Sequence, residues 1–227
     1  MAPASSRKVT WAELLAHPEV EERFRLAAPV GLMAFHGGLE AGTAEIVEQA
    51  AAATGASLYV VSQPATLRWH VPSHSVDPAA SVALRDWLDH VEVAVALHGY
   101  GRVRQPRRIL LGGRNRAAAT FLGQCLARRL PHLTAVTDLD QIPPELRGLH
   151  PSNPVNRTRR AGVQVELPPS ARDRFLDPAA PGLVAAALAD LVDACRDATT
   201  ISSSDGRLLR DAIGRSGPPG ARHHRAD

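Results

Sequence analysis

A chain of 227 residues can bury one sizeable core, and its 44% hydrophobic and 22% charged residues are ordinary for a globular protein. No apolar run approaches the roughly 20 residues that span a bilayer, which excludes a membrane-spanning class and predicts no membrane partner. The N-terminal stretch MAPASSRKVTWAELLAHPEV lacks the apolar centre of a secretory signal and predicts a cytoplasmic protein.

Short apolar runs alternate along the chain with longer runs of helical periodicity. Strands are predicted at 29–35, 57–62, 91–97, 108–112, 132–136 and 162–167, and helices at 43–54, 78–89, 115–130 and 180–198. This alternation predicts an α/β fold, a single domain with a mixed, mostly parallel sheet and helices on both faces.

We predict a domain over residues 28–198, preceded by an N-terminal segment over 1–27. Residues 199–227 are rich in Ser, Gly and Arg and predict a disordered tail. The proline-rich stretch 138–161 is interpreted as a long ordered loop, and such loops often border a site.

Reactive side chains follow three of the predicted strands. His36 and Glu40 follow the first, His98 ends the third, and Glu166 lies near the end of the last. The carboxyl ends of strands gather ligand sites in α/β sheets, and two imidazoles with one carboxylate are a common ligand set for catalytic zinc. We therefore predict a zinc ion held by His36, Glu40 and His98. The alternative is two unrelated loop histidines, with Glu40 capping or solvating the helix that starts near Thr43.

Hydrolysis at such a centre also needs a group that accepts a proton from the attacking water. Glu166 is our candidate, because its apolar neighbours Val165 and Leu167 indicate partial burial, which raises a carboxyl pKa. The alternative is an alternating strand residue that faces solvent, with Gln164 beside it on the same face.

The motifs HGGLEAGTAEI (36–46), RWHVPSH (68–74), VAVALHGYG (93–101), ILLGGRNR (109–116) and NPVNRTRRAGVQVELPPSARD (153–173) occur in one order along the chain. In this the sequence resembles the phage and bacterial poly-gamma-glutamate hydrolases, zinc hydrolases related in fold to carboxypeptidase A. The resemblance covers roughly residues 28 to 197. It implies a zinc-carboxypeptidase-like fold, zinc as cofactor, ligands at His36, Glu40 and His98, and a catalytic glutamate at Glu166. The segment HGGLE is one residue shorter than the HGGGIE form associated with the family.

A gamma-glutamyl substrate is an acidic, peptide-like partner, and guanidinium groups suit its carboxylates. Arg114 follows a predicted strand, and Asn156 and Arg157 precede Glu166, so we predict that these three contact substrate. Solvated surface arginines are the alternative for Arg114 and Arg157. His70 could orient a substrate carboxylate or a transition-state oxygen, or it could be an ordinary buried histidine.

The predicted function is zinc-dependent hydrolysis of amide bonds, with gamma-glutamyl linkages as substrate and a glutamate as general base. One alternative is a zinc amidohydrolase or carboxypeptidase that acts on short gamma-glutamyl peptides, cell-wall peptides or acylated amino acids. A family member that binds acidic polymer without cutting it is another. The arginine run over 102–116 also allows a nucleic-acid-binding protein, but the chain has only 4% aromatic residues for base stacking and no binding motif, so we do not expect this partner.

Overall fold

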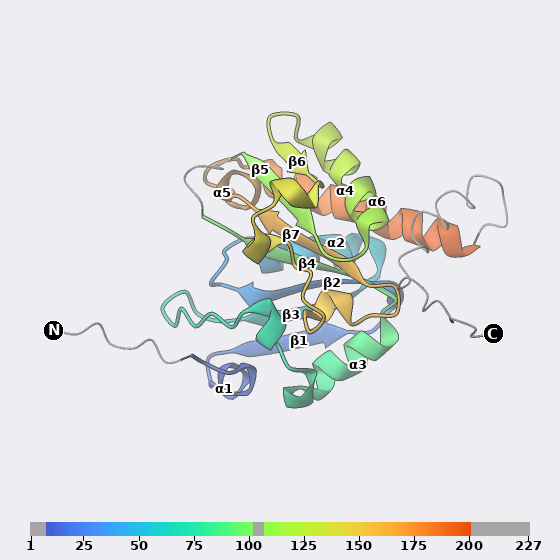
Figure 1. Ribbon diagram of the computed structural model, residues 1–227. Coiled ribbons are helices and arrows are strands. Elements are labelled where there is room, and N and C mark those ends of the chain that lie inside the picture. Colours follow the sequence, from blue (N-terminus) through green and yellow to red (C-terminus); the bar gives the residue numbers. More distant parts are fainter. Residues whose placement is uncertain (1–7, 102–106, 201–227) are drawn as a thin grey trace, which may run out of the picture.

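The computed structural model describes residues 8–101 and 107–200, and within them seven strands form one mixed sheet flanked by helices (Figure 1). The strands are β1 (Glu21–Arg25), β2 (Ala28–Gly37), β3 (Ala56–Ser62), β4 (Val93–Gly99), β5 (Arg108–Gly112), β6 (Thr134–Val136) and β7 (Gly162–Leu167). The α-helices are α1 (Trp11–Leu15), α2 (Thr43–Thr54), α3 (Val82–His90), α4 (Arg116–Arg129), α5 (Pro169–Arg172) and α6 (Ala180–Thr200). The predicted α/β class and mixed sheet are confirmed.

The order of strands in the sheet is β1-β3-β2-β4-β7-β5-β6. Strands β3, β2, β4 and β7 run parallel to one another, whereas β1 is antiparallel to β3 and β5 is antiparallel to β7. The carboxyl ends of β2, β4 and β7 therefore meet at the same edge, where the sequence places its reactive side chains.

The central strands are apolar along nearly their whole length because both faces of the sheet are covered. Every residue of β7 is buried, and in β4 only Gly99 is less than fully buried. A strand buried on both faces needs a continuous apolar run, so VAVAL and GVQVEL are typical of a covered parallel sheet.

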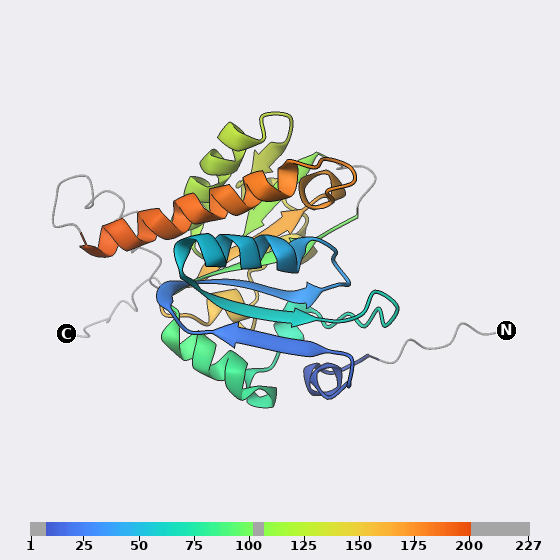
Figure 2. The same ribbon diagram turned by 180° about the vertical axis from the view of Figure 1, so that it is seen from behind.

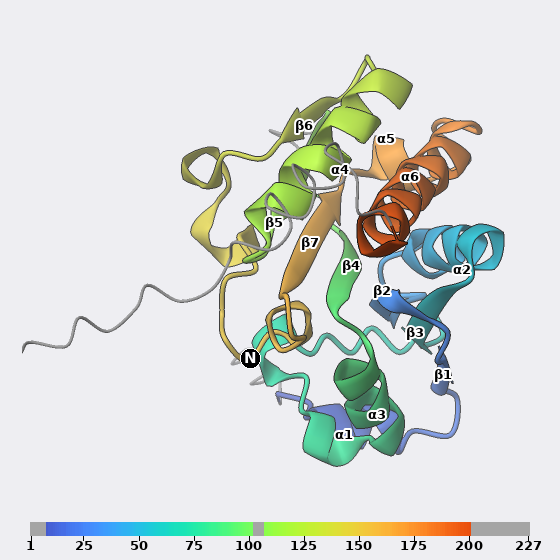
Figure 3. The same cartoon turned by 90° about the vertical axis from the view of Figure 1, so that its right-hand side faces the viewer.

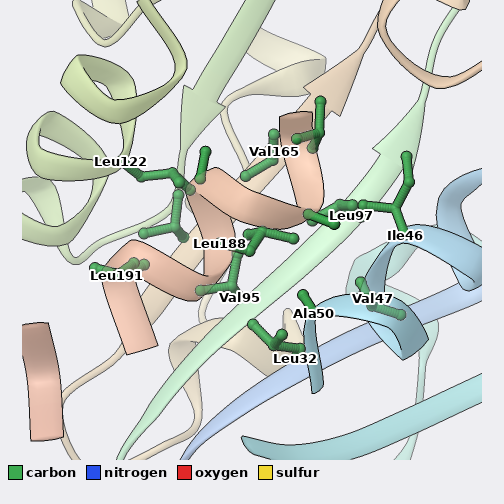
Figure 4. Close-up of a cluster of buried hydrophobic side chains, with 14 of the residues drawn as sticks. Leu32, Ile46, Val47, Ala50, Val95, Leu97, Leu122, Val165, Leu188 and Leu191 are labelled. Atoms are coloured by element: carbon green, nitrogen blue, oxygen red, sulfur yellow. The ribbon is translucent and has the colours of Figure 1, made fainter. Parts of the chain in front are cut away.

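Helices α2, α4 and α6 cover one face, and Figure 2 shows α2 and α6 side by side across it. In the core of this face, strand residues such as Leu32, Val95 and Leu97 pack against helix residues such as Ile46 and Leu188 (Figure 4). Helices α1 and α3 lie on the opposite side (Figure 3). There the core contains aromatic side chains of both the sheet and the helices: Trp11, Phe35, Tyr59 and Trp87.

Strand β1 was not predicted from the sequence. It lies in the segment 1–27 that we placed before the domain, yet it pairs with β3 along its whole length. All five of its residues, EERFR, are exposed, so they show none of the apolar alternation that marks a strand. Charged residues are common on edge strands because they discourage pairing with another chain.

Other boundaries differ by a few residues. Pro78–Ala80 forms a 3-10 turn rather than the start of α3, because Ser81 has an extended backbone and caps α3 through its side chain. The segment 138–161 is a long loop, as predicted, with 3-10 turns at Leu139–Gln141, Pro144–Leu146 and Pro154–Asn156. Residues 201–227, which make up nearly all of the predicted tail, lie outside the described residues, as do Arg102 and Arg104. In the described part of the chain, no helix combines the length and apolarity that a membrane crossing needs.

Candidate metal centre

Three side chains predicted as ligands converge at the carboxyl end of the parallel strands. His36 is in β2, His98 is in β4, and Glu40 lies in the loop that leads to α2. His36 Nδ1 lies 3.0 Å from Glu40 Oε1, and His98 Nδ1 lies 3.2 Å from His36 Nδ1 and 3.4 Å from Glu40 Oε2. One nitrogen of each imidazole and the two carboxylate oxygens of Glu40 thus lie within contact distance of one another.

These separations fit one zinc ion. Zinc binds nitrogen and oxygen ligands at about 2.0–2.2 Å in tetrahedral geometry, which places its ligand atoms roughly 3.3–3.5 Å from one another. His36 Nε2 lies 2.8 Å from the carbonyl oxygen of Val71. Since a carbonyl can only accept, Nε2 carries the proton in the neutral ring, and Nδ1 offers a lone pair to Glu40. Two lone pairs face each other favourably only when a cation or proton lies between them.

Backbone contacts hold Glu40 and its loop in place. The backbone N–H of Gly99 donates to Glu40 Oε2 at 2.9 Å, and the N–H of Glu40 donates to the carbonyl of His36 at 2.9 Å. Gly38 has a φ of +77°, and a Cβ there would lie 1.8 Å from the carbonyl oxygen of Gln63. The loop that is one residue short still brings His36 and Glu40 together, because glycine permits this tight turn.

Contacts within the cluster shift the pKa values of Glu40 and His98. Burial alone would raise the pKa of Glu40, but the protonated form of His36 lowers that pKa well below its ordinary value, through its charge and its hydrogen bond. Burial opposes the charged form of His98, yet the hydrogen bond to Glu40 raises its pKa. Each group is thus stabilised by the opposite charge of its neighbour.

Glu166 lies on the neighbouring strand, directly beside His98 in the register of β4 and β7. Only 4% of Glu166 is exposed. Burial raises the pKa of its carboxyl, while the charge of His98 opposes this shift. Gln164 donates to Glu166 Oε1 at 2.8 Å and in turn accepts from Asn153 at 2.6 Å. The predicted alternative of a solvent-facing glutamate is wrong, because both faces of β7 are covered.

His70 borders the cluster from the loop after β3. One of its ring nitrogens forms a group with His36 and Glu40 in which the donor atoms all lie within 4.8 Å of one another. The His70 and His36 ring centroids are 4.7 Å apart. His98 Nδ1 lies 3.2 Å from His36 Nδ1 and 3.4 Å from Glu40 Oε2, so we favour His98 over His70 as the third ligand of a metal ion. His70 is exposed, so the alternative of an ordinary buried histidine is wrong.

A pocket of about 490 Å³ opens over the cluster, and its walls include Glu166 and the loop residues Leu146 and His150. The predicted loop at 138–161 thus borders the site. The described residues that line this pocket include five histidines, His36, His70, His74, His98 and His150, but none is Lys or Arg.

The predicted substrate contacts Arg114, Arg157 and Asn156 do not line this pocket. Asn156 uses its side chain within the protein: its amide donates to the carbonyls of Gly148 and His150 at 2.7 and 2.9 Å and accepts from the N–H of Arg114 at 3.0 Å. Arg114 Nε donates to the carbonyl of Leu149, while the Arg157 side chain is exposed. Asn156 therefore fastens the loop, and its sequence-based role as a substrate contact has no support from this geometry.

Sequence reasoning missed Arg172, the last residue of α5. Its Nη1 donates to the carbonyl of Ala41 at 2.6 Å, and its Nε contacts the carbonyl of Leu167 at 3.4 Å. A Cβ on Gly99 would lie 2.5 Å from this Nε, so the guanidinium packs directly on the backbone of Gly99. One side chain thus joins the residues that follow Glu40, His98 and Glu166. The SARD motif contained this arginine, but no sequence spacing indicates contacts across 131 residues.

In the described part of the arginine run, residues 107–116, several guanidinium groups already form hydrogen bonds within the protein. Arg116 donates to the carbonyls of Leu111, Gly113 and Thr137, and Arg108 contacts Gln141. Arg116 therefore holds the end of β5 and is not positioned as a phosphate contact. This weakens the nucleic-acid alternative.

A buried pair of imidazoles and a carboxylate, beside a second buried carboxylate, is typical of hydrolases that use a single metal ion. The chain belongs to the poly-gamma-glutamate hydrolase family, because its residues 10–181 match the model of that family. The resemblance drawn from the motifs is confirmed, and the match includes α1 and β1.

Two solved structures share the fold. The structure of a bacteriophage poly-gamma-glutamate hydrolase superposes with a TM-score of 0.67 at 22% identity, covering 78% of this chain and 90% of that one. A second, YNDL in a zinc-free apo form, superposes with a TM-score of 0.64 at 21% identity, covering 77% of this chain and 90% of that one. Among curated proteins, a sequence search found no match.

Proposed function

We propose that this enzyme hydrolyses gamma-glutamyl amide bonds with the help of one zinc ion. The observation that carries the proposal is the convergence of His36, Glu40 and His98, whose nitrogen and oxygen atoms approach one another to 3.0–3.4 Å, next to a buried glutamate on the adjoining strand. His36, Glu40 and His98 would hold the metal, and Glu166 would act as general base. The zinc-free designation of one structural neighbour supports zinc as the metal.

When bound, zinc supplies Lewis-acid polarisation of the scissile carbonyl and lowers the pKa of water. Glu166 accepts the proton of the attacking water as the new C–O bond forms, and it returns a proton to the leaving nitrogen as the C–N bond breaks. The raised pKa of its buried carboxyl suits both transfers. Gln164 holds the orientation of Glu166 through its 2.8 Å hydrogen bond.

The other side chains that we predicted to contact substrate differ in their distance from the metal pocket. His70 is exposed at the rim of the metal pocket, where its ring can donate to a substrate carboxylate or to a transition-state oxygen. Arg114 and Arg157 lie outside that pocket, so any contact with substrate would involve more distant parts of a polymer.

Metal removal tests this proposal. We expect zinc-loaded protein to release gamma-glutamyl oligomers from poly-gamma-glutamate, and expect little release from alpha-linked polyglutamate. Chelation should abolish the activity and added zinc should restore it. Undiminished release from metal-free protein would contradict the role of zinc. Faster turnover of short gamma-glutamyl peptides than of polymer would favour the alternative of an amidohydrolase acting on short peptides.

A further inference from the structure

A second pocket, of about 950 Å³, adjoins the metal pocket. The two share a wall made of His70, Pro72 and His74. The second pocket extends from this wall to α1 and to the turn at Arg68 and Trp69. A long ligand whose scissile bond lies at the metal cluster could therefore extend past this shared wall into the second pocket.

The lining of the second pocket combines basic side chains with apolar surface. Lys8 and Arg68 supply positive charge, while Val9, Pro18 and Trp69 supply apolar contacts. The acidic group among its lining residues, Glu13, already accepts hydrogen bonds from the backbone and hydroxyl of Thr10 in the capping box of α1. The charge offered to a ligand is therefore predominantly positive.

The wall that carries Arg68 is rigidly joined to the metal centre. Gln63 donates to the carbonyl of Trp69 at 2.7 Å and accepts from its N–H at 2.8 Å, which closes the turn between them. The backbone N–H of Gln63 donates to the carbonyl of Gly37, next to the ligand His36. Arg68 has a φ of +51°, a left-handed conformation that is unfavourable for a non-glycine residue and tends to occur at functional sites.

We propose that the second pocket binds the part of an acidic gamma-linked polymer that lies beyond the scissile bond. Each unit of such a chain carries one carboxylate and two methylene groups, which match the cations and apolar walls of this pocket. The metal pocket has no Lys or Arg among its described lining residues, so Lys8 and Arg68 are the side chains of the adjoining pocket that can neutralise a polyanion. The inference rests on the proposed function, because it assumes that the same ligand reaches the metal cluster.

The test measures binding separately from turnover. In the zinc-loaded Glu166→Gln background, the Kd of a fluorescent gamma-glutamate oligomer long enough to reach both pockets is compared among variants. Arg68→Gln should weaken binding about tenfold, since it removes one charged hydrogen-bond donor. Arg68→Lys should restore most of the affinity. The matched control is Arg85→Gln, which removes an exposed arginine of α3 that lines neither pocket, and it should change the Kd by at most about twofold.

A kinetic measurement in the otherwise wild-type protein supplies the second readout. Arg68→Gln should lower the ratio of kcat/KM for the oligomer to kcat/KM for a gamma-glutamyl dipeptide by about tenfold. Thermal unfolding of each variant checks that the fold is retained.

The outcomes separate this inference from the proposed function. If the wild type cleaves gamma-glutamyl bonds but Arg68→Gln and Arg85→Gln have equal oligomer affinity, the second pocket is not a polymer site. If Arg68→Gln loses affinity while the wild type cleaves no gamma-glutamyl bond, the pocket binds acidic polymer and the proposed reaction is wrong. Failure of the oligomer to bind at all overturns both.

Discussion

The metal cluster and the walls of its pocket are built in different ways. Two of the proposed ligands and the proposed base lie in three adjacent parallel strands, β2, β4 and β7, where sheet hydrogen bonds set their spacing. The walls come from loops before α3 and between β6 and β7, whose course depends on side chains such as Gln63 and Asn156. The groups on the strands should therefore control chemistry and metal binding. The side chains that hold the loops should control the stability of the protein and the access of substrate to the pocket.

The largest expected effect concerns the strand-borne base. Glu166→Gln removes a proton acceptor at nearly constant volume, so turnover should fall about 10²- to 10⁴-fold while zinc stays bound. Rates on gamma-glutamyl oligomer and the zinc content of the same samples provide the check. Glu45→Gln, an exposed glutamate of α2, is the matched control and should keep full turnover. Glu166→Gln protein with both its metal and undiminished turnover would exclude Glu166 as the base.

A smaller effect, on zinc affinity, is expected at Arg172, which contacts the residues that follow Glu40, His98 and Glu166. Arg172→Ala removes the donor to Ala41 and the group packed on Gly99, so Glu40 and His98 lose support from outside the cluster. Loss of such outer contacts typically weakens metal binding by about 10- to 100-fold. Competition with a zinc chelator measures it. The exposed neighbour Arg174 provides the control, and equal zinc affinity of Arg172→Ala and Arg174→Ala would exclude a positioning role.

The smallest effect on zinc affinity is expected at Asn156, whose side chain holds the pocket loop in place. Asn156→Ala leaves the carbonyls of Gly148 and His150 without their amide donor, so the free energy of unfolding should fall by about 1–3 kcal/mol. Zinc affinity should stay close to that of the wild type. Urea unfolding and chelator competition measure the two quantities. A large loss of zinc affinity without a loss of stability would break the division between strands and loops.

The same division explains what sequence reasoning could predict. His36, His98 and Glu166 each follow or end an apolar run, and parallel strands bring their carboxyl ends together, so the location of the site follows from pattern alone. Strand β1 escaped prediction because its exposed EERFR sequence lacks any apolar period. Arg172 and Arg68 escaped because their positions depend on tertiary contacts, one reaching to Ala41 and the other fixed by the turn that Gln63 closes. Asn156 was assigned to substrate because a loop residue near a catalytic strand can face either the ligand or its own loop, and spacing does not distinguish these.

Metal binding by His98→Ala and His70→Ala tests the central claim most directly. Both histidines approach His36, but only His98 brings its nitrogen within 3.2 Å of His36 Nδ1 and 3.4 Å of Glu40. The zinc Kd of each purified variant would be measured by chelator competition beside the wild type. Our account predicts that His98→Ala weakens zinc binding by more than about 100-fold, more than the loss of a side chain that only supports a ligand, whereas His70→Ala keeps its zinc. Loss of zinc from His70→Ala, together with retention by His98→Ala, would contradict the proposed ligand set.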